Sequence, residues 1–276
     1  MHPREGWQFL LKGTEAVKKW LVAFGMLATF AGFVFWVTSK LARFEGSVEM
    51  SVPSLPETCR IVAFEAVDHV VCEVDPGEYD IAMSLKGRDG TPYGSLAALA
   101  KSKTFVFAMN AGMYHHDKSP VGLYVENGEE AVPLNRSEGD GNFFLKPNGV
   151  FYVDQSGMAG VQETEAFAAS SKRMEMATQS GPMLVIDGAI HPRFLNDGSS
   201  RYIRNGVGVR NNGTAVFAIS KSALSLGSFA RLFRDALDCP NALFFDGGIS
   251  ALHDGSQYLV GGRDPAGPIV TITRKH

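Results

Sequence analysis

Residues suited to chemistry stand at the ends of two apolar, strand-like runs in this chain of 276 residues. Asp246 closes one run, and Gly247-Gly248 directly after it lets the backbone approach another group closely. Arg201 and Arg204 precede the other run, where an inward-facing arginine needs an anion from the protein or from a ligand. A strand-end carboxylate together with such an arginine indicates a site that acts on a bound anion.

Two further clusters combine polar side chains with glycine. Asn110 and Gly112 follow an apolar run at 105–109, and Gln179 and Ser180 precede Gly-Pro and another apolar run. Taken alone, each of these clusters is explained by an ordinary turn at the end of a strand.

In this order, the four clusters resemble the phosphodiester glycosidase family over roughly 105–273. The family's Asn-Gly-Gly-aromatic element is similar to Asn110-Ala111-Gly112-Met113-Tyr114, and its Gln/Ser-Gly-Pro element is similar to Gln179-Ser180-Gly181-Pro182. Its Arg-x-Gly-x-Gly element is similar to Arg204-Asn205-Gly206-Val207-Gly208, and its Asp-Gly-Gly-x-Ser element is similar to Asp246-Gly247-Gly248-Ile249-Ser250. Ala111 and Met113 depart from the family's glycine and frequent aromatic residue, so we expect a different pocket wall and a different sugar.

The resemblance implies hydrolysis of a sugar-1-phosphodiester at the anomeric C–O bond. The leaving phosphate monoester is already a stable anion, so one carboxylate with cationic binding can replace the usual carboxylate pair. Asp246 is expected to act on the anomeric carbon as nucleophile or as base for water, and Arg204, with Arg201 in reserve, to hold the phosphate. Substrate binding is assigned to Asn110, Gly112, Gln179, Ser180, Arg201, Asn205, Gly247, Gly248 and Ser250.

Structural alternatives exist for both catalytic residues. Asp246 can cap the Gly-Gly turn, and Arg204 can form an internal salt bridge with Asp246 or Asp187. The alternative function is a non-catalytic envelope protein that binds glycan. No cofactor is predicted and a divalent cation is left open, because His115-His116-Asp117 lacks the companion ligands of a metal motif.

Many short apolar runs separated by turn residues predict a largely antiparallel, mixed sheet. Asn127-Gly128, Pro147-Asn148-Gly149, Asp187-Gly188 and Asn212-Gly213 are read as hairpin turns. Helical spacing predicts helices at 95–103 and 225–237, with serine at both N-caps, and a shorter helix at 162–169. The expected fold class is α+β, with a few helices covering the sheet.

Residues 20–37 carry no charge and match the thickness of a bilayer, so a transmembrane signal anchor is predicted at 20–38. A cleaved signal peptide is the alternative, although the apolar run is long and lacks a clear cleavage site. The positive-inside bias places the N-terminus in the cytoplasm. The protein is therefore expected to be a single-pass protein of the inner membrane, with its domain facing the periplasm or the exterior. The predicted divisions are a cytoplasmic 1–19, the anchor at 20–38, a linker at 39–58 and one phosphodiester glycosidase-like domain at 59–276.

Cysteine usage leaves one question open. Cys59 and Cys72 flank a potential hairpin and are read either as a disulfide or as two buried thiols, whereas Cys239 is read as a packed thiol. The net charge of −3 and the absence of a basic block after residue 43 argue against nucleic acid as a partner. The expected partners are a phosphodiester-linked glycan or glycolipid and, through the N-terminal helix, the membrane.

Overall fold

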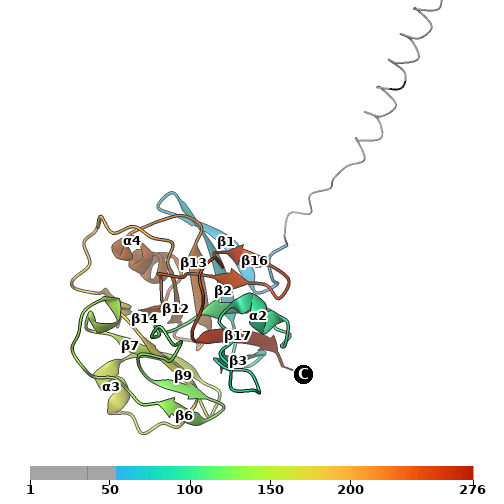
Figure 1. Cartoon of the computed structure of the whole chain (residues 1–276). Helices are drawn as coiled ribbons and strands as arrows, with labels where there is room; N and C mark the ends of the chain where they lie inside the picture. The colour runs from blue at the N-terminus through green and yellow to red at the C-terminus, as the bar shows by residue number, and fades with distance from the viewer. Residues whose placement is uncertain (1–35, 37–53, 276) are drawn as a thin grey trace, which may run out of the picture. The chain divides into compact units, whose positions relative to one another are not determined.

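The computed structural model describes Trp36 and residues 54–275, which are built mainly from three antiparallel sheets (Figure 1). The first sheet holds seven strands, in the order β1 (Cys59–Phe64), β2 (Val67–Val74), β13 (Ala215–Ser220), β12 (Asn205–Val209), β14 (Asn241–Phe244), β10 (Met183–Ile186) and β11 (Ala189–Ile190). The second sheet runs β16 (Tyr258–Val260), β15 (Leu252–His253), β4 (Phe107–Asn110), β17 (Ile269–Arg274) and β3 (Tyr79–Ser84). The third runs β6 (Glu129–Val132), β5 (Tyr124–Glu126), β9 (Met174–Ser180), β7 (Gly149–Asp154) and β8 (Ala159–Glu163).

The expected α+β class with largely antiparallel pairing is confirmed, but the strands form three sheets instead of one. Every strand pair between residues 54 and 275 is antiparallel, so no parallel component makes these sheets mixed. Successive strands such as β1 and β2 or β7 and β8 pair with each other, but the chain passes from the first sheet to the second and the third, and then returns to the first and the second. The second sheet, for example, draws β3, β4 and β17 from distant parts of the sequence.

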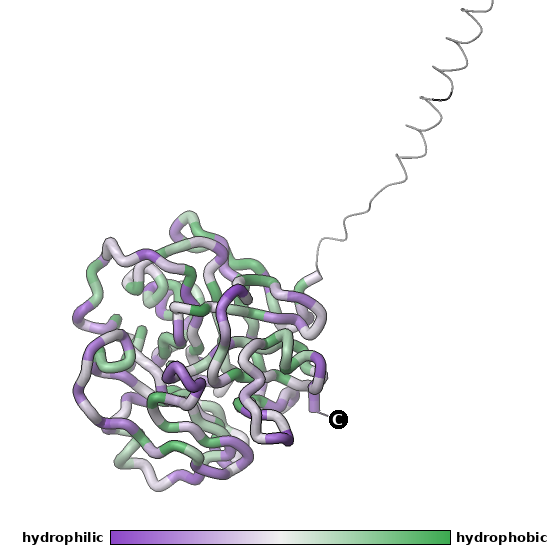
Figure 2. The backbone as a smooth tube through the Cα atoms, viewed as in Figure 1, coloured by the Kyte–Doolittle hydropathy of each residue, from purple (hydrophilic) through white to green (hydrophobic). Residues whose placement is uncertain are grey.

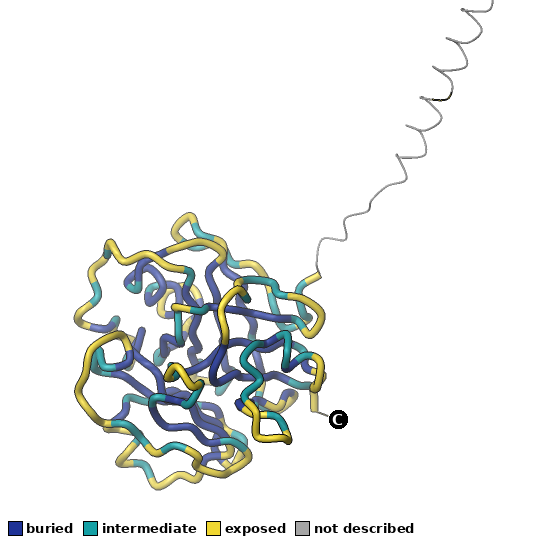
Figure 3. The backbone as a smooth tube through the Cα atoms, in the orientation of Figure 1, coloured by how far each residue is buried: buried dark blue, intermediate teal, exposed yellow. Residues whose placement is uncertain are grey.

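Aromatic side chains join the three sheets at the centre of the molecule. Phe217 of the first sheet lies with its ring centroid 5.6 Å from those of Phe107 in the second sheet and Phe151 in the third, both edge to face. Edge-to-face contact places the positive ring edge against the negative ring face, which favours such pairs beyond their burial. Figures 2 and 3 show the buried strands at the centre and exposed loops, many of them hydrophilic, at the periphery.

Three of the four predicted hairpin turns are confirmed, and one of them, Asn212-Gly213, lies in the turn that joins β12 to β13, with positive φ at Gly213. Asn127-Gly128 joins β5 to β6 and Asp187-Gly188 joins β10 to β11, each with positive φ at both turn residues. Pro147-Asn148-Gly149 is not a hairpin turn, because it leads from the 3₁₀ helix η1 (Asn142–Phe144) into β7. Asn148 is buried there and donates to the Phe143 carbonyl at 2.9 Å, a contact with a preceding residue that a surface hairpin would not require.

Three short helices occupy the predicted places. Ser95 caps α2 (Leu96–Ala100), and Ser225 caps α4 (Leu226–Arg231), each accepting a backbone N–H at 3.1 Å three residues later. The π-helical turn η2 (Leu232–Ala236) continues α4, and α3 is Thr164–Ala168. Phe229 and Phe233 bury one face of the α4 segment in a core cluster that includes residues of the first sheet.

The open question about cysteine is settled in favour of a disulfide. Cys59 and Cys72 are directly paired across β1 and β2 and their sulfurs are 2.07 Å apart. Cys239 is a buried free thiol, and burial raises its pKa to about 12. The prediction of a packed thiol at Cys239 is therefore confirmed.

The predicted anchor at 20–38 lies outside the described residues, apart from Trp36. Between residues 54 and 275, no helix is long and apolar enough to cross a membrane. The chain separates into one unit that ends at Val52 and another that begins at Pro53, a boundary inside the predicted linker. The membrane segment and the division at 39–58 remain predictions.

Candidate active site

A buried network of polar side chains joins three of the four sequence clusters. Asn110, at the end of β4, donates to the Asp246 carbonyl at 2.8 Å, and its Oδ1 accepts the Ala251 N–H at 2.8 Å. Asn205, at the start of β12, donates from Nδ2 to the Asn110 carbonyl and Oδ1, at 2.9 and 3.0 Å. Ser250 Oγ lies 3.0 Å from Asn205 Oδ1. These three buried side chains use their hydrogen bonds to hold the strand ends together, and they thereby position the loop that carries Asp246.

Asp246 follows shortly after β14 and carries a half-buried carboxyl beside this network. Its backbone N–H donates to the Ala111 carbonyl at 3.1 Å, and its Oδ1 accepts the Gly248 N–H at 3.1 Å. Burial raises the pKa of Asp246, and the hydrogen bond from Gly248 opposes this shift only in part. The residue therefore does cap the Gly-Gly turn, and its carboxyl also has the raised pKa expected at a functional position.

A cavity of about 440 Å³ opens beside the Asp246 turn, and we call it the Asp246 cavity. Its walls come from the Asp-Gly-Gly-x-Ser element, from residues that precede β12 and from the loop between β16 and β17: Gly247, Gly248, Ile249, Ser250, Tyr202, Ile203, Gly261, Gly262, Arg263 and Asp264. Arg263 is exposed and makes no hydrogen bond or ion pair within the described part of the chain. The cavity therefore has an uncommitted guanidinium in the same lining as Gly247 and Gly248, the two residues that directly follow Asp246.

Tyr114 holds the loop between β16 and β17 against the site. Its hydroxyl donates to the Pro265 carbonyl, and its ring occupies the space that a side chain at Gly267 would need. Burial raises the pKa of Tyr114 to about 12, with smaller contributions from the negative charges of Asp246 and Asp264. Tyr114 is thus protonated at neutral pH and lies within electrostatic reach of two carboxylates.

The side chain of Gln179 makes all of its hydrogen bonds to other parts of the protein. Its Oε1 accepts the backbone N–H groups of Leu123 and Asn135 at 3.0 and 2.9 Å, while Nε2 donates to the Asn135 carbonyl and Thr164 Oγ1 at 2.7 and 3.2 Å. All of its hydrogen-bonding positions are occupied, so Gln179 has none left for a sugar hydroxyl. Ser180 Oγ differs, because it is buried without a hydrogen-bond partner among the described atoms.

Gly112 packs directly on the strand that carries Gln179. Its N–H approaches Thr178 Oγ1 at 3.3 Å, and a Cβ built on Gly112 would stand 2.5 Å from the Gln179 carbonyl oxygen. That oxygen belongs to a buried strand and has little freedom to move. The glycine is therefore explained by close approach to the protein backbone.

Replacing Gly112 by alanine is expected to lower the free energy of unfolding by about 1–3 kcal/mol, the usual cost of overpacking. Urea denaturation of the variant and the wild type measures this difference. Gly198→Ala is the matched control, since its Cβ would come no closer than 3.7 Å to any neighbour. Equal midpoints for the two variants would contradict the proposed crowding at Gly112.

The structure does not bring Arg204 and Asp246 into contact. Arg204 is 2% exposed and donates from Nε to the Leu224 carbonyl and from Nη2 to the Ser200 carbonyl, both at 2.8 Å. Among residues 54–275 it forms no ion pair with Asp246 or Asp187, and neither the Arg204 nor the Asp246 charge shifts the other's pKa. Arg201 is exposed and pairs with Asp197. Neither arginine lines the Asp246 cavity.

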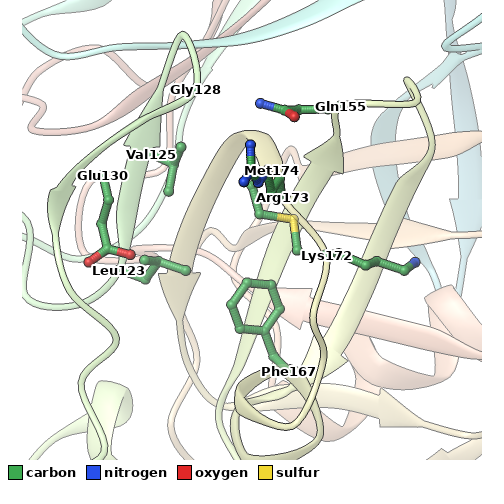
Figure 4. Close-up of a pocket in the computed structure, with 9 residues that line it drawn as sticks. All are labelled: Leu123, Val125, Gly128, Glu130, Gln155, Phe167, Lys172, Arg173 and Met174. Atoms are coloured by element: carbon green, nitrogen blue, oxygen red, sulfur yellow. The ribbon is translucent and has the colours of Figure 1, made fainter.

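A separate cavity of about 420 Å³ opens on the third sheet and contains none of the catalytic or substrate-binding residues predicted from the sequence (Figure 4). In this view Phe167 lies below Met174, with Glu130 at the left of the cavity and Lys172 at the right. Between residues 54 and 275, no group of three or more His, Cys, Asp and Glu side chains is arranged to hold a metal ion.

Sequence reasoning missed the loop that closes the Asp246 cavity. Gly261 and Gly262 both have positive φ and turn the chain so that Arg263 and Asp264 line the cavity. A Gly-Gly pair followed by two charged residues, between two strand-like runs, was the signal available in the sequence. Tyr114 entered the sequence analysis only as the last residue of the Asn110 motif, and it was assigned no role in the site.

Comparisons with known proteins identify a relative of this chain and structures that share its fold. An uncharacterized protein of Escherichia coli K12, YigE, is 36% identical over 206 residues, covering 73% of this chain and 80% of that protein. The zebrafish N-acetylglucosamine-1-phosphodiester alpha-N-acetylglucosaminidase catalytic domain, auto-inhibited by its pro-peptide, shares the fold with a TM-score of 0.58 at 14% identity, over 79% of this chain and 82% of that one. A hypothetical protein from Synechocystis has a TM-score of 0.52 at 14% identity, over 79% of this chain and 61% of the other.

A sequence profile described as phosphodiester glycosidase matches residues 103–256. The matched range contains the Asn110 network, Asp246 and the Gly-Gly turn, and it stops before Arg263. The chain therefore belongs to the phosphodiester glycosidase family.

Proposed function

We propose that this protein hydrolyses a sugar-1-phosphodiester at the anomeric C–O bond, in an envelope glycan or glycolipid. The observation that carries the proposal is the half-buried Asp246 carboxyl, which has a raised pKa and directly precedes Gly247 and Gly248 in the wall of a cavity that an unpaired arginine also lines. A protein that only binds glycan has no need for a carboxylate with a raised pKa beside an anion site. Membership of the phosphodiester glycosidase family supports the same class of reaction.

In this proposal Asp246 acts on the anomeric carbon and Arg263 holds the phosphate. Asp246 serves either as nucleophile or as base that takes the proton from the attacking water, while the C–O bond breaks and the phosphate monoester leaves as an anion. The Gly247 N–H forms no hydrogen bond within the described part of the chain and is available to a phosphate oxygen. Arg263 takes the place of Arg204 as phosphate ligand because only Arg263 lines the cavity beside Asp246.

The proposed setting of this reaction is the outer side of the inner membrane. It depends on the predicted signal anchor at 20–38, whose N-terminal flank is richer in positive charge than its C-terminal flank. A domain held there by residues 39–58 would meet phosphodiester-linked glycans or their lipid-linked precursors.

Turnover assays with the full-length protein test the proposal. A panel of sugar-1-phosphodiesters that vary in sugar, anomeric configuration and aglycone is incubated with the protein, and release of the phosphate monoester is measured. We expect turnover of at least one member of the panel. No turnover anywhere, together with measurable binding of the same compounds, would identify a glycan-binding protein instead.

The pH dependence of kcat/KM should report the titration of Asp246. We expect the rate to fall on acidification with a midpoint above the ordinary aspartate pKa of 3.8, because burial raises the pKa and the reaction needs the ionised carboxylate. Tyr114 has a pKa of about 12 and does not titrate in this range. Melting temperatures across the same pH series exclude unfolding as the cause, and a rate that stays constant down to pH 3.8 would contradict the role of Asp246.

A further inference from the structure

A further cavity, of about 220 Å³, is lined by Arg204, and we call it the Arg204 cavity. Segment 200–204 contributes to both cavities: Ser200 and Arg204 line the Arg204 cavity, whereas Tyr202 and Ile203 line the Asp246 cavity. The two cavities are thus adjacent along one short stretch of chain. No residue lines both of them.

The Arg204 guanidinium is a buried cation that has no carboxylate partner among residues 54–275. Its protein acceptors are two backbone carbonyls at 2.8 Å and, more weakly, Ser200 Oγ at 3.5 Å. Burial lowers the pKa of Arg204 to about 10, so the group is still charged at neutral pH. Buried charges in proteins are normally paired, and an unpaired one is costly. The guanidinium also lies over the rings of Tyr202 and Phe244, with Cζ 5.6 and 5.4 Å from their centroids, so aromatic faces and carbonyl oxygens stabilise this charge without any carboxylate among the described residues.

Arg193 adds a second positive charge to the same cavity. It is exposed, its side chain forms no ion pair among the described residues, and it lines the cavity together with the hydroxyl-bearing Ser199 and Ser225. No acidic side chain is part of the lining, and the nearby Asp197 is paired with Arg201. The Arg193 guanidinium can bind phosphate oxygens in a bidentate manner, and Arg204 can add its Nη1 group, which has no acceptor among the described residues, because its Nε and Nη2 donate to backbone carbonyls. Together with the hydroxyl donors, these groups match the oxygens of a phosphate group.

Tyr202 connects this cavity to the Asp246 cavity. Its ring is 59% exposed and lines the Asp246 cavity, while its centroid lies 5.6 Å from Cζ of Arg204. An exposed aromatic ring offers an apolar face to a sugar. A chain-like ligand in the Asp246 cavity can therefore pass over Tyr202 toward the two arginines.

We propose that the Arg204 cavity binds a second phosphate group of the substrate, so that the substrate class is a glycan with more than one phosphodiester-linked unit. This inference rests on the proposed function and adds to it the kind of molecule that is cleaved. Arg263 holds the scissile phosphate, and Arg204 and Arg193 hold the next one. Binding energy gained at the second phosphate selects polyanionic substrates over single sugar-phosphodiesters.

Three synthetic compounds test the second site with the full-length protein. The first is a sugar-1-phosphodiester with a neutral sugar as aglycone, the second carries an additional phosphate on that aglycone, and the third carries a carboxylate there. We expect KM for the second compound to be about tenfold lower than for the first, the effect of one charge-assisted contact of about 1.4 kcal/mol. Equal KM values would overturn the proposal, and equal preference for the third compound would overturn its assignment to phosphate.

Arg193→Ala separates this site from the catalytic one. The variant should lose the tenfold preference while it keeps the wild-type KM for the neutral compound, and Arg193→Lys should keep part of the preference. Arg88→Ala is the matched control, because Arg88 is an exposed arginine that lines none of the cavities and forms no ion pair in the described part of the chain. An unchanged preference in Arg193→Ala would contradict the proposal.

Equilibrium binding decides the matter if no compound is cleaved. Calorimetric titration of the Asp246→Asn protein with the first and second compounds measures the preference without turnover. A Kd for the second compound that is tenfold lower than for the first would establish the second site even if the proposed hydrolysis failed, provided that the Asp246→Asn/Arg193→Ala double variant loses this preference. Equal Kd values would reject the second site even if hydrolysis were observed.

Discussion

Replacing Asp246 by asparagine is expected to lower kcat/KM on a cleavable sugar-1-phosphodiester by at least about 100-fold, the usual loss when one catalytic group is removed. The same variant should melt at the wild-type temperature or above it. Asparagine keeps the shape of the side chain, and its Oδ1 can still accept the Gly248 N–H that Asp246 accepts at 3.1 Å. The turn is therefore preserved while the charge needed for chemistry is lost.

The expected gain in stability follows from the direction of the Asp246 pKa shift. Burial raises this pKa, so the folded protein holds the proton more tightly than the unfolded chain does. The contribution of Asp246 to the free energy of unfolding is then fully present below the unfolded pKa and is lost as pH rises through the folded pKa. Asparagine carries no charge to bury, so the difference in melting temperature should be larger at pH 7 than at pH 4.

Asp89→Asn provides the matched control for this substitution. Asp89 also accepts the N–H of the residue two positions later, Thr91, at 3.0 Å, but it is exposed and its pKa is lowered by hydrogen bonds at Thr91. This variant should keep full activity and gain no stability at neutral pH. If Asp246→Asn instead lost activity and melting temperature together, its main role would be to cap the turn.

The second large effect is expected at Asn110. Replacing it by alanine should lower the free energy of unfolding by about 2–3 kcal/mol, because the Ala251 N–H would lose its acceptor and one unsatisfied buried group costs about 1–3 kcal/mol. The Asp246 carbonyl would keep only the weaker hydrogen bond from the Ile249 N–H, at 3.4 Å. Asn205 Nδ2 would also lose one of its two acceptors on Asn110. Urea denaturation gives the free energy directly.

Catalysis should fall as well in Asn110→Ala, since the network fixes the loop that carries Asp246. Asn212→Ala is the control: Asn212 is exposed, accepts only the Thr214 N–H at 3.1 Å and lies in a turn far along the chain from the Asp246 loop. We expect its free energy of unfolding to change by about 0.5 kcal/mol or less. If both variants unfolded at the same urea concentration, Asn110 would not be holding the strand ends together.

Features that depend on neighbouring residues were predictable from the sequence. Ser95 and Ser225 cap their helices through contacts three residues away, and Asn127-Gly128 adopts positive φ whatever lies elsewhere in the chain. The prediction failed at Pro147-Asn148-Gly149, where the same turn residues lead into a buried strand and Asn148 hydrogen-bonds inside the core. The local sequence pattern shows which residues can form a turn, but it does not show whether that turn is buried in the folded protein.

The sequence by itself determined the antiparallel α+β class, the position of Asp246 at a strand end and the family, because periodicity, turn residues and motif order are properties of the chain. Only the tertiary structure decided which charged groups share a cavity. Arg204 belongs to one of the sequence motifs and Arg263 does not, yet the fold buries Arg204 at a different cavity and places Arg263 in the cavity that Gly247 and Gly248 line. The physical reason is that strands distant in sequence meet in three sheets, and the contacts between these sheets set the direction in which each loop is held.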